Sequence, residues 1–364
     1  MFSICIITKN EEIKLKKCLS SLCSFFTPGK EAEIVVVDTG SDDNSIDIAK
    51  NAGASVYLFE WGQDFSKARN FAIEKARNDW ILMVDTDEYL ESVDKDELER
   101  VLSGDEHIRG FVQTRNHFLS DKQERISNEW IPRLFSRKYY RYEGRIHEQL
   151  VEIDSDTGES KYVNIPMIFD HDGYLLTKDE IAKKAERNIK LLLEEERLLE
   201  QENASDEKKA YIKYQLGKSF YFKQEYLCAT EFFEKGLSYD LDEHLEFVID
   251  MVVSYGYALI NSGQEEKALD LEGVFDTFSD DADFLFVMGL IYMKNAKFNR
   301  SLETFERTLH IKSSRIEGAN GYLSCYNIGV IYECLGEKNK ACEWYLKCGD
   351  YEPAKRNCLN CRDK

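Results

Sequence analysis

The stretch from Trp80 to Tyr89 constrains the fold more than any other part of the sequence. Ile81–Val84 is a short apolar run typical of a strand buried on both faces, and Asp85 and Asp87 follow it directly. Open α/β sheets bind their ligands at the carboxyl ends of the strands. An Asp-x-Asp pair placed there suits Mg²⁺ or Mn²⁺, which prefer oxygen ligands and keep positions open for substrate phosphates. Solvated acidic loops carry the same pattern, so the prediction depends on the surrounding sequence.

The residues before this stretch alternate between strand-like and helical patterns. Phe2–Thr8 is a β-branched apolar run, and apolar residues then recur at helical spacing after Asn10, the expected N-cap. Further strands are predicted at Glu33–Val37 and Ser55–Glu60, separated by a helix over Ser45–Asn51. Such alternation implies parallel pairing with right-handed crossovers. The sequence therefore predicts an α/β, Rossmann-like first domain with a mostly parallel sheet.

A second group of carboxylates follows the predicted second strand. Asp38 opens the turn Asp-Thr-Gly-Ser-Asp-Asp, and a carboxylate at this edge can accept hydrogen bonds from a uracil imide or a ribose. Asp38 and Asp85 would repel the phosphates of a nucleotide, and no G-x-G-x-x-G or Walker loop supplies backbone amides instead. A metal on the Asp-x-Asp would supply the missing positive charge. Asp38 is equally well explained as a turn-forming residue, and Arg69 either faces the phosphates or forms an ordinary surface ion pair.

Composition excludes several classes of function. The 364 residues are enough for two domains, and 68 acidic against 48 basic residues give a formal net charge of −20. That charge argues against a nucleic-acid partner, which Lys and Arg would have to meet. Ten scattered cysteines and an amino terminus without signal-peptide features indicate reduced thiols in a cytoplasmic protein. No apolar run approaches the roughly 20 residues of a membrane span.

The second half of the chain contains a repeat. Four dipeptides occupy the Leu-Gly position of a tetratricopeptide unit: Leu216-Gly217, Tyr255-Gly256, Met288-Gly289 and Ile328-Gly329. Subtracting the numbers of successive glycines gives spacings of 39, 33 and 40, close to the period of this repeat. Glu272 stands where an aromatic residue is usual. We expect helical repeats over residues 204–364, preceded by a linker helix over 177–203, with an extended surface for a peptide or for a homodimer.

Five cysteines crowd the end of this half. Cys358 and Cys361 form a C-x-x-C pair, but no second pair stands at zinc-knuckle spacing. We interpret these cysteines as small buried apolar residues followed by a loose tail.

Four segments of the first 90 residues resemble the family 2 glycosyltransferases, which have a GT-A fold. They are S-I-C-I-I-T-K-N-E, V-V-V-D-T-G-S-D-D-N-S, F-S-K-A-R-N and L-M-V-D-T-D-E, in the order and spacing of that family. The resemblance implies a GT-A domain over residues 1–176 and a nucleotide-diphosphate sugar donor, with UDP as the expected nucleotide. It places Asp85 on the ribose or the metal and Asp87 on the metal. The residues that it places along the nucleotide sugar are Thr8, Asn10, Glu11, Asp38, Asp42, Arg69, Asp85 and Thr86.

Glu148 is the residue that we expect to act as the catalytic base. Inverting sugar transfer to a hydroxyl or thiol needs one general base opposite the leaving diphosphate. Glu148 follows His147 in a segment that also holds Trp130, Arg133 and three tyrosines, and the aromatic rings can stack on a sugar. We therefore assign Trp130, Arg133, His147 and the later Tyr174 to the acceptor side. The alternative for Glu148 is a solvated residue on an edge strand.

The run from Asp170 to Tyr174 carries an H-x-G-Y motif. It resembles the motif that closes the catalytic domain in tetratricopeptide-bearing family 2 transferases, where the histidine joins the metal or the diphosphate. Imidazole is a ligand that Mn²⁺ accepts beside carboxylates. The resemblance thus implies a Mn²⁺ or Mg²⁺ site formed by Asp85, Asp87 and His171.

The same motif, with W-x-x-D-F-S-x-A-R-N and G-x-x-H-E, is similar to the sublancin-type S-glycosyltransferases of ribosomal peptides, over roughly the first 200 residues. This resemblance implies a protein or peptide acceptor. Two alternatives stay open: transfer to a cell-surface polysaccharide or lipid-linked carrier, and an inactive transferase that serves as a repeat scaffold. The retained acidic residues favour the enzyme over the scaffold.

Overall fold

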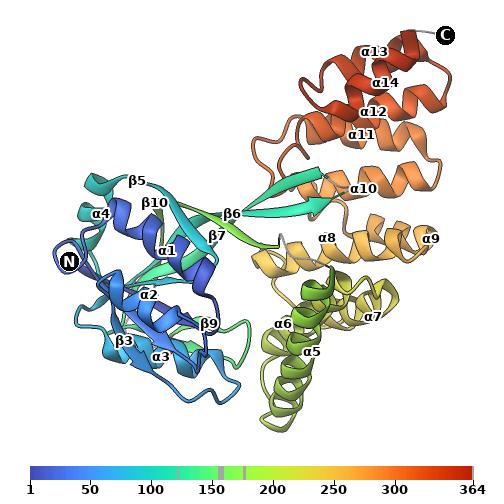
Figure 1. Cartoon of the computed structure of the whole chain (residues 1–364). Helices are drawn as coiled ribbons and strands as arrows, with labels where there is room; N and C mark the ends of the chain where they lie inside the picture. Colours follow the sequence, from blue (N-terminus) through green and yellow to red (C-terminus); the bar gives the residue numbers. More distant parts are fainter. Residues whose placement is uncertain (121–122, 155–159, 175–177, 363–364) are drawn as a thin grey trace. The chain divides into compact units, whose positions relative to one another are not determined.

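The chain forms two compact units, Met1–Thr177 and Lys178–Lys364 (Figure 1). The structure is a computed structural model that describes residues 1–120, 123–154, 160–174 and 178–362. Within these ranges it describes only the backbone of residues 118–120, 123–125, 173–174, 178–179 and 360–362. The first unit is built around a sheet and the second around helices (Figure 1).

An eight-stranded sheet forms the centre of the first unit. Its strands follow the order β3-β2-β1-β4-β7-β6-β10-β5. They are β1 (Phe2–Thr8), β2 (Ala32–Asp38), β3 (Ser55–Leu58), β4 (Trp80–Val84), β5 (Glu88–Val93), β6 (Ile108–Ser120), β7 (Gln123–Ser136) and β10 (Lys161–Tyr174). A separate antiparallel pair consists of β8 (Tyr140–Glu143) and β9 (Gln149–Glu152).

The sheet is parallel on one side and mixed on the other. Strand β1 pairs in parallel with β2 and β4, and β2 pairs in parallel with β3, which confirms the predicted α/β core. Strand β7 runs antiparallel to both β4 and β6, and β5 runs antiparallel to β10. Strands β6 and β10 are parallel. The predicted parallel pairing is thus found in the four strands β3-β2-β1-β4 and between β6 and β10, while the other pairings of the sheet are antiparallel.

Helices cover both faces of the sheet. Helices α1 (Glu12–Phe25), α2 (Ser45–Asn51) and α4 (Lys95–Leu102) pack on one face, while α3 (Phe65–Lys75) and the β8–β9 pair pack on the other. This sandwich explains why the central strands are apolar throughout, because each of their two faces meets a core.

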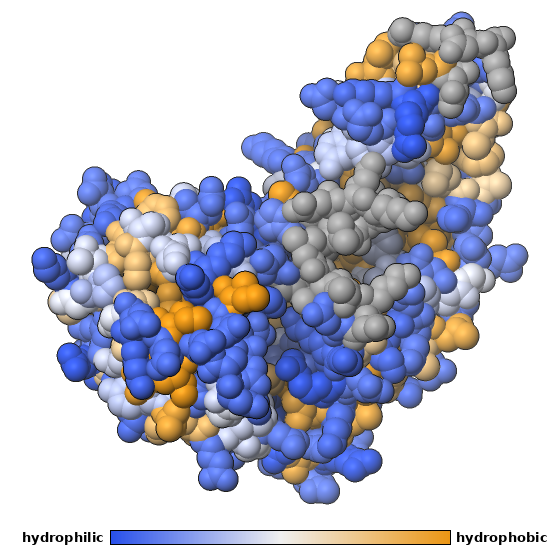
Figure 2. All heavy atoms as spheres, viewed as in Figure 1, coloured by the Kyte–Doolittle hydropathy of each residue, from blue (hydrophilic) through white to orange (hydrophobic). Residues whose placement is uncertain are grey.

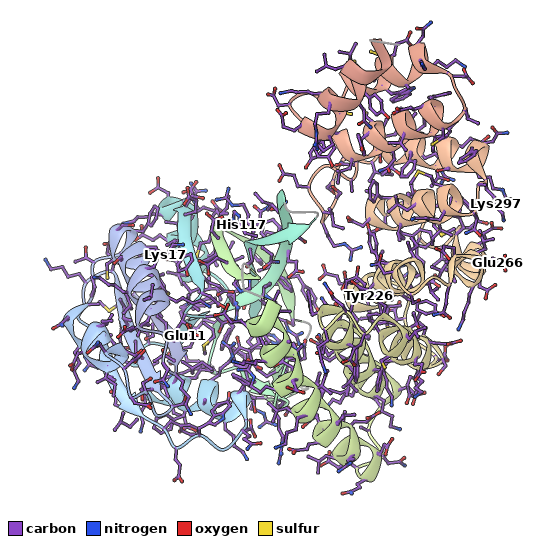
Figure 3. All side chains as sticks on the ribbon, turned by 45° about the vertical axis from the view of Figure 1, so that its right-hand side comes forward. Glu11, Lys17, His117, Tyr226, Glu266 and Lys297 are labelled. Carbon is purple, nitrogen blue, oxygen red and sulfur yellow. The ribbon has the colours of Figure 1, made fainter. Side chains whose placement is uncertain are left out.

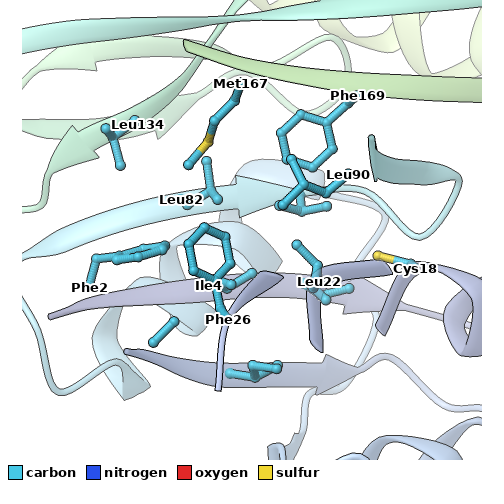
Figure 4. Packing of buried hydrophobic residues seen from close by; sticks show 14 of the residues in the cluster. Phe2, Ile4, Cys18, Leu22, Phe26, Leu82, Leu90, Leu134, Met167 and Phe169 are labelled. Atoms are coloured by element: carbon cyan, nitrogen blue, oxygen red, sulfur yellow. The ribbon is translucent and has the colours of Figure 1, made fainter. Parts of the chain in front are cut away.

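The two cores take alternate residues of the same strand. Ile4 and Ile6 of β1 join the core under α1, whereas Cys5 joins the core under α3. Figure 4 shows the first core, in which the rings of Phe2 and Phe26 meet edge to face with their centroids 5.2 Å apart. This packing fixes the strand ends that carry the acidic residues.

Helix α1 begins differently from the prediction. Its N-cap is Glu11 rather than Asn10, whose backbone is left-handed with a φ of 52°. The Asn10 side chain instead accepts a hydrogen bond from the Asp42 N–H at 2.8 Å, and the Asn10 N–H donates to Ser41 Oγ at 2.9 Å. Asn10 therefore joins the turn after β1 to the turn after β2. Its position in the sequence was compatible with both roles, and only the neighbouring turn decides between them.

The described part of the second unit contains helices α5 to α14 and the 3₁₀ helix η2. Their bounds are α5 (Lys178–Gln201), α6 (Asp206–Phe222), α7 (Tyr226–Leu237), α8 (Glu246–Asn261), α9 (Glu265–Ala268), the 3₁₀ helix η2 (Leu269–Val274), α10 (Ala282–Lys294), α11 (Phe298–Thr308), α12 (Tyr322–Cys334), α13 (Lys338–Leu346) and α14 (Glu352–Arg362). Helix α5, which the sequence presents as a linker, belongs to this unit and packs on α6. The predicted Leu-Gly dipeptides lie in α6, α8, α10 and α12, the first helices of successive helix pairs.

Gly217, Gly289 and Gly329 each make room for a ring of the second helix in their pair. A Cβ atom built on Gly217 would lie 2.5 Å from the Phe233 ring, and one built on Gly289 would lie 2.6 Å from the Phe305 ring. The second repeat has Glu272 at the corresponding position. There the second helix shortens to α9 followed by η2, and Glu272 pairs with Arg300 at 2.7 Å. The departure seen in the sequence is thus a real irregularity of one repeat.

The cysteines near the end of the chain differ in their exposure, and the surface of the protein is mainly polar. Cys348 and Cys358 are buried as predicted, Cys334 is exposed, and the Sγ atoms of Cys342 and Cys358 lie 2.6 Å apart. No helix in the described ranges is both long and apolar enough to span a bilayer. Hydrophilic side chains dominate the face shown in Figure 2.

Candidate active site

The carboxyl ends of β1 and β2 form the first part of the site. Thr8 and Asp38 end these strands and face each other in the parallel register. They are only 3% and 1% exposed. Thr8 Oγ1 and Asp38 Oδ2 have no hydrogen-bond partner within the described chain, although burying a polar atom without one costs free energy. Two such oxygens at neighbouring strand ends are suited to a polar ligand.

Asp38 has the turn-forming role that its sequence allowed. Its Oδ1 accepts hydrogen bonds from the N–H groups of Gly40 and Ser41, at 3.0 and 2.9 Å, and so holds the turn. Glycine is favoured at position 40 because its φ of 103° is one that residues with a side chain rarely adopt. The second oxygen of Asp38 remains for a ligand.

The other residues predicted near the nucleoside lie in the two turns beside Thr8 and Asp38. Glu11 donates its N–H to Ser45 Oγ at 3.2 Å, and the exposed Asp42 is held through its N–H by Asn10. The structure therefore brings Thr8, Asn10, Glu11, Asp38 and Asp42 to one edge of the sheet.

Asp85, the first carboxylate after β4, lies between two buried guanidinium groups. Arg69 Nη2 donates to Asp85 Oδ1 at 2.8 Å, and Arg133 Nη2 donates to Asp85 Oδ2 at 2.6 Å. Burial alone would raise the pKa of Asp85, but the charges of Arg133 and Arg69 outweigh it and hold the pKa below its usual range. Asp85 is thus ionised, with both oxygens directed at arginines. Arg133, assigned to the acceptor side from the sequence, contacts the Asp-x-Asp turn directly.

Glu88 is hydrogen-bonded to the same turn. It is 3% exposed, accepts the Asp85 N–H at 3.0 Å through Oε2, and accepts Arg133 Nη2 through Oε1. Burial raises its pKa. Glu88 therefore fixes the shape of the Asp85–Asp87 turn, in which Thr86 is half-buried.

Glu148 forms an ion pair with Arg69. Arg69 Nε donates to Glu148 Oε1, so one arginine joins Asp85 to Glu148. Two positive-φ residues shape the loop that presents Glu148, Gly144 at 95° and His147 at 50°. The Glu148 side chain is only 8% exposed, so it is not the solvated residue on an edge strand that the sequence allowed as the alternative.

Helix α3 explains why the F-S-K-A-R-N segment carries so many polar residues. Asp64 caps the helix by accepting the Lys67 N–H at 3.0 Å. Asn70 binds the backbone of Tyr142 on β8 at both groups, donating to its carbonyl at 2.8 Å and accepting its N–H at 2.9 Å. Sequence reasoning missed Asn70, although its place beside Arg69 in the motif was a usable signal. Together these bonds fix Arg69 against the hairpin that leads to Glu148.

Asp87 and His171 form a second pair near the end of β4. His171 Nε2 lies 3.5 Å from Asp87 Oδ2, and its Nδ1 lies 2.6 Å from Asn116 Oδ1. Because the amide oxygen can only accept, Nδ1 carries the proton of this bond, and Nε2 faces Asp87. An imidazole nitrogen beside a carboxylate is a donor set that Mn²⁺ accepts. Asn116 was not singled out from the sequence, because the pairing of β6 with β10 brings it to His171.

The three predicted metal ligands are not equivalent. Across the described residues, no three His, Cys, Asp or Glu side chains gather closely enough to hold an ion by themselves. Asp87 and His171 fit a divalent cation as two protein ligands, with the other positions left to water and phosphate oxygens. Asp85 instead directs its two oxygens at Arg69 and Arg133.

Helix α1 places cations beside this pair. Lys14 Nζ lies 3.9 Å from Asp87 Oδ2, and Lys17 Nζ lies 3.3 Å from Asp172 and 3.6 Å from the centroid of the Tyr89 ring. Figure 3 labels Lys17 together with Glu11 just before the helix. These lysines add positive charge to an edge that the sequence presents as purely acidic.

The remaining residues predicted on the acceptor side are Trp130, Tyr174 and His147. Trp130 on β7 is 41% exposed, so its ring is available to a partner. The side chain of Tyr174 lies outside the part of the chain described in atomic detail. His147 immediately precedes Glu148 in the loop.

The first unit has the arrangement of a GT-A-like domain, because parallel strands β1 and β2 end at Thr8 and Asp38 and an Asp-x-Asp turn follows β4. This domain is followed by helix pairs of the tetratricopeptide type. Residues 3–157 match the family described as Glycosyl transferase family 2, and residues 322–355 match the tetratricopeptide repeat. The chain thus carries a family 2 glycosyltransferase domain, as its sequence motifs predict.

Known proteins resemble parts of the chain. The glycosyltransferase SunS of Bacillus subtilis is 30% identical over 207 residues, which cover 54% of this chain and 45% of SunS. A TPR repeat-containing protein of Synechococcus elongatus is 43% identical over 88 residues, 24% of this chain and 21% of that protein. The crystal structure of TarS residues 1–349 from S. aureus aligns with 72% of this chain and 82% of its own, at 15% identity and a TM-score of 0.30. The chain spans less than half the length of SunS.

Proposed function

We propose that this protein is a metal-dependent, inverting glycosyltransferase that moves a sugar from a nucleotide diphosphate, expected to be UDP, to a protein or peptide. The observation that carries the proposal is the pair of buried oxygens without partners, Thr8 Oγ1 and Asp38 Oδ2. They stand at the same strand edge as the turn that presents Asp87. A uracil or ribose would supply the hydrogen bonds that these oxygens lack.

Each charged residue then has a task in the transfer. Asp87 and His171 would hold a divalent cation, which offsets the charge of the diphosphate when bound. Glu148, held by Arg69, accepts the proton of the attacking hydroxyl or thiol. A bond forms between the acceptor atom and the anomeric carbon as the bond to the diphosphate oxygen breaks. Attack opposite the leaving group inverts the configuration.

The helical repeats support a macromolecular acceptor. Stacked helix pairs present extended surfaces of the kind that bind peptides. The relative SunS is itself named a glycosyltransferase. We therefore propose that this protein binds a peptide or protein acceptor as well as the sugar donor.

The test measures donor binding first and transfer second. UDP is titrated into the protein by calorimetry with Mn²⁺ and with EDTA, and we expect binding to depend on the metal. A panel of UDP-sugars is then incubated with peptide acceptors, and mass spectrometry should find a hexose-sized adduct on the peptide. Binding of UDP without any turnover, in transfer or hydrolysis, would favour an inactive scaffold. The absence of nucleotide binding would refute the proposal.

A further inference from the structure

The hydroxyl of Tyr142 is buried and has no partner, in the middle of the candidate site. Tyr142 lies on β8 and is 5% exposed. Its hydroxyl makes no hydrogen bond within the described residues. Native proteins rarely leave such groups unpaired without a functional reason, because the lost hydrogen bonds to water are not replaced.

A second unpaired donor lies beside it. The guanidinium carbon of Arg69 stands 5.3 Å from the centroid of the Tyr142 ring, and Arg69 Nη1 is also buried with no partner in the described part of the chain. The other two nitrogens of Arg69 are engaged, Nε with Glu148 and Nη2 with Asp85. The guanidinium that carries the unpaired Nη1 therefore lies next to the ring that carries the unpaired hydroxyl.

The position of Tyr142 is fixed, so the missing partner is not explained by a loose side chain. Asn70 binds both backbone groups of Tyr142, and the ring packs against Phe135 at a centroid distance of 5.7 Å. The charges of Arg69, Arg133, Glu148 and Asp85 all act on its phenol. Burial raises the pKa of Tyr142 to about 12, so the hydroxyl is a donor at neutral pH.

We propose that the Tyr142 hydroxyl, together with Arg69 Nη1, donates hydrogen bonds to oxygen atoms of the transferred sugar. The inference rests on the proposed function and adds a substrate-binding residue to it. Arg69, which lies beside the Tyr142 ring, joins Asp85 in the turn after β4 to Glu148, the proposed base that would face the acceptor. The transferred sugar is the one group that must lie between donor and acceptor, and its hydroxyl and ring oxygens accept hydrogen bonds.

Two substitutions on the same strand test the proposal. Tyr142→Phe removes only the unpaired hydroxyl. Tyr140→Phe is the matched control, because Tyr140 is 1% exposed and its hydroxyl is already bonded to Ser160 Oγ at 2.5 Å. Both variants are titrated with UDP, UDP-glucose, UDP-galactose and UDP-N-acetylglucosamine in the presence of Mn²⁺, and their thermal unfolding is measured without ligand.

We expect Tyr142→Phe to weaken binding of the UDP-sugar that the wild-type protein prefers by about 5- to 30-fold, which corresponds to the loss of about 1–2 kcal/mol of hydrogen bonding. Binding of UDP should stay within about twofold, since the proposal gives the hydroxyl a contact with the sugar and none with the nucleotide. The ligand-free variant should unfold at an equal or higher temperature, because an unsatisfied group has been removed. Tyr140→Phe should behave in the opposite way, with unchanged ligand binding and lower stability.

Other outcomes overturn the inference in distinguishable ways. Equal weakening of UDP and UDP-sugar, or no weakening of either, would show that the hydroxyl does not contact the sugar, while the proposed function would stand. A loss of stability in Tyr142→Phe would mean that the hydroxyl has a structural partner. If the wild-type protein bound neither UDP nor any UDP-sugar, the proposed function would fail and this inference with it.

Discussion

Arg69 holds Glu148 in a direct ion pair, and each side chain is only 8% exposed. A general base must be positioned as well as available, and the guanidinium positions one carboxylate oxygen of Glu148. The same arginine also donates to Asp85, so Glu148 is linked to the turn that follows β4. This arrangement makes the role of Glu148 open to a direct test.

Glu148→Gln should leave UDP binding intact and lower transfer to a hydroxyl acceptor by about 10²- to 10⁴-fold, the usual contribution of a general base. The amide keeps the shape of the side chain and can still accept from Arg69, but it cannot take a proton. The loss should be smaller with a thiol acceptor, whose pKa of about 8.5 lies nearer its working pH. Rates come from single-turnover assays of peptide modification.

The control for this substitution is Glu143→Gln in the same hairpin, since Glu143 is 39% exposed and pairs with Arg141 on the surface. It should transfer at the wild-type rate. If Glu148→Gln also transferred at that rate, the Arg69–Glu148 pair would be purely structural, and His147 would become the next candidate base.

Thr8→Val should weaken UDP binding by roughly 3- to 10-fold, because it replaces the unpaired buried hydroxyl with a methyl group of similar size. The free protein should not be destabilised, since no bond to Thr8 Oγ1 is lost. Asp38→Ala should weaken UDP more strongly, but it also removes the oxygen that holds Gly40 and Ser41. Calorimetric titration with UDP measures both, and undiminished affinity in Thr8→Val would argue against a nucleotide at this edge.

Asp87→Ala should abolish the metal dependence of UDP binding, because it removes the carboxylate that faces His171 Nε2 at 3.5 Å. Mn²⁺ binding followed by electron paramagnetic resonance provides a readout that does not depend on turnover. Asp96→Ala is a suitable control, since Asp96 is exposed in the first turn of α4 and is not among the residues predicted to bind the nucleotide sugar or the metal. Tight Mn²⁺-dependent binding of UDP to Asp87→Ala would move the metal to other ligands.

The sequence was sufficient where local pattern determines structure. Phe2–Thr8 and Ser45–Asn51 have the predicted bounds, because apolar periodicity and the flanking turns specify them. Strand β5 was not foreseen, since Glu88–Val93 follows the acidic turn directly and is a strand only through its antiparallel pairing with β10. Such long-range pairing has no local signal.

The site shows the same division. The motifs identified Asp38, Asp85 and Glu148 as polar groups at strand ends and in loops, but not what each would contact. Asp85 faces Arg133 because β7 lies beside β4, and His171 meets Asn116 because β10 lies beside β6. Residue type and spacing therefore predict the members of the site, and tertiary pairing decides their partners.

Gly217→Ala and Gly256→Ala form a matched pair that tests the packing of the repeats. A Cβ on Gly217 would lie 2.5 Å from the Phe233 ring, whereas one on Gly256 would lie 3.1 Å from Val287 Cγ2. Alanine is favoured over glycine inside a helix by about 1 kcal/mol. That gain should roughly offset the milder crowding at Gly256, but overpacking against a buried ring costs about 1–3 kcal/mol. We therefore expect Gly217→Ala to lower the unfolding temperature of the full chain and Gly256→Ala to leave it nearly unchanged, as measured by circular dichroism. Equal effects at both positions would show that the aromatic ring of the second helix does not set the spacing of the pair.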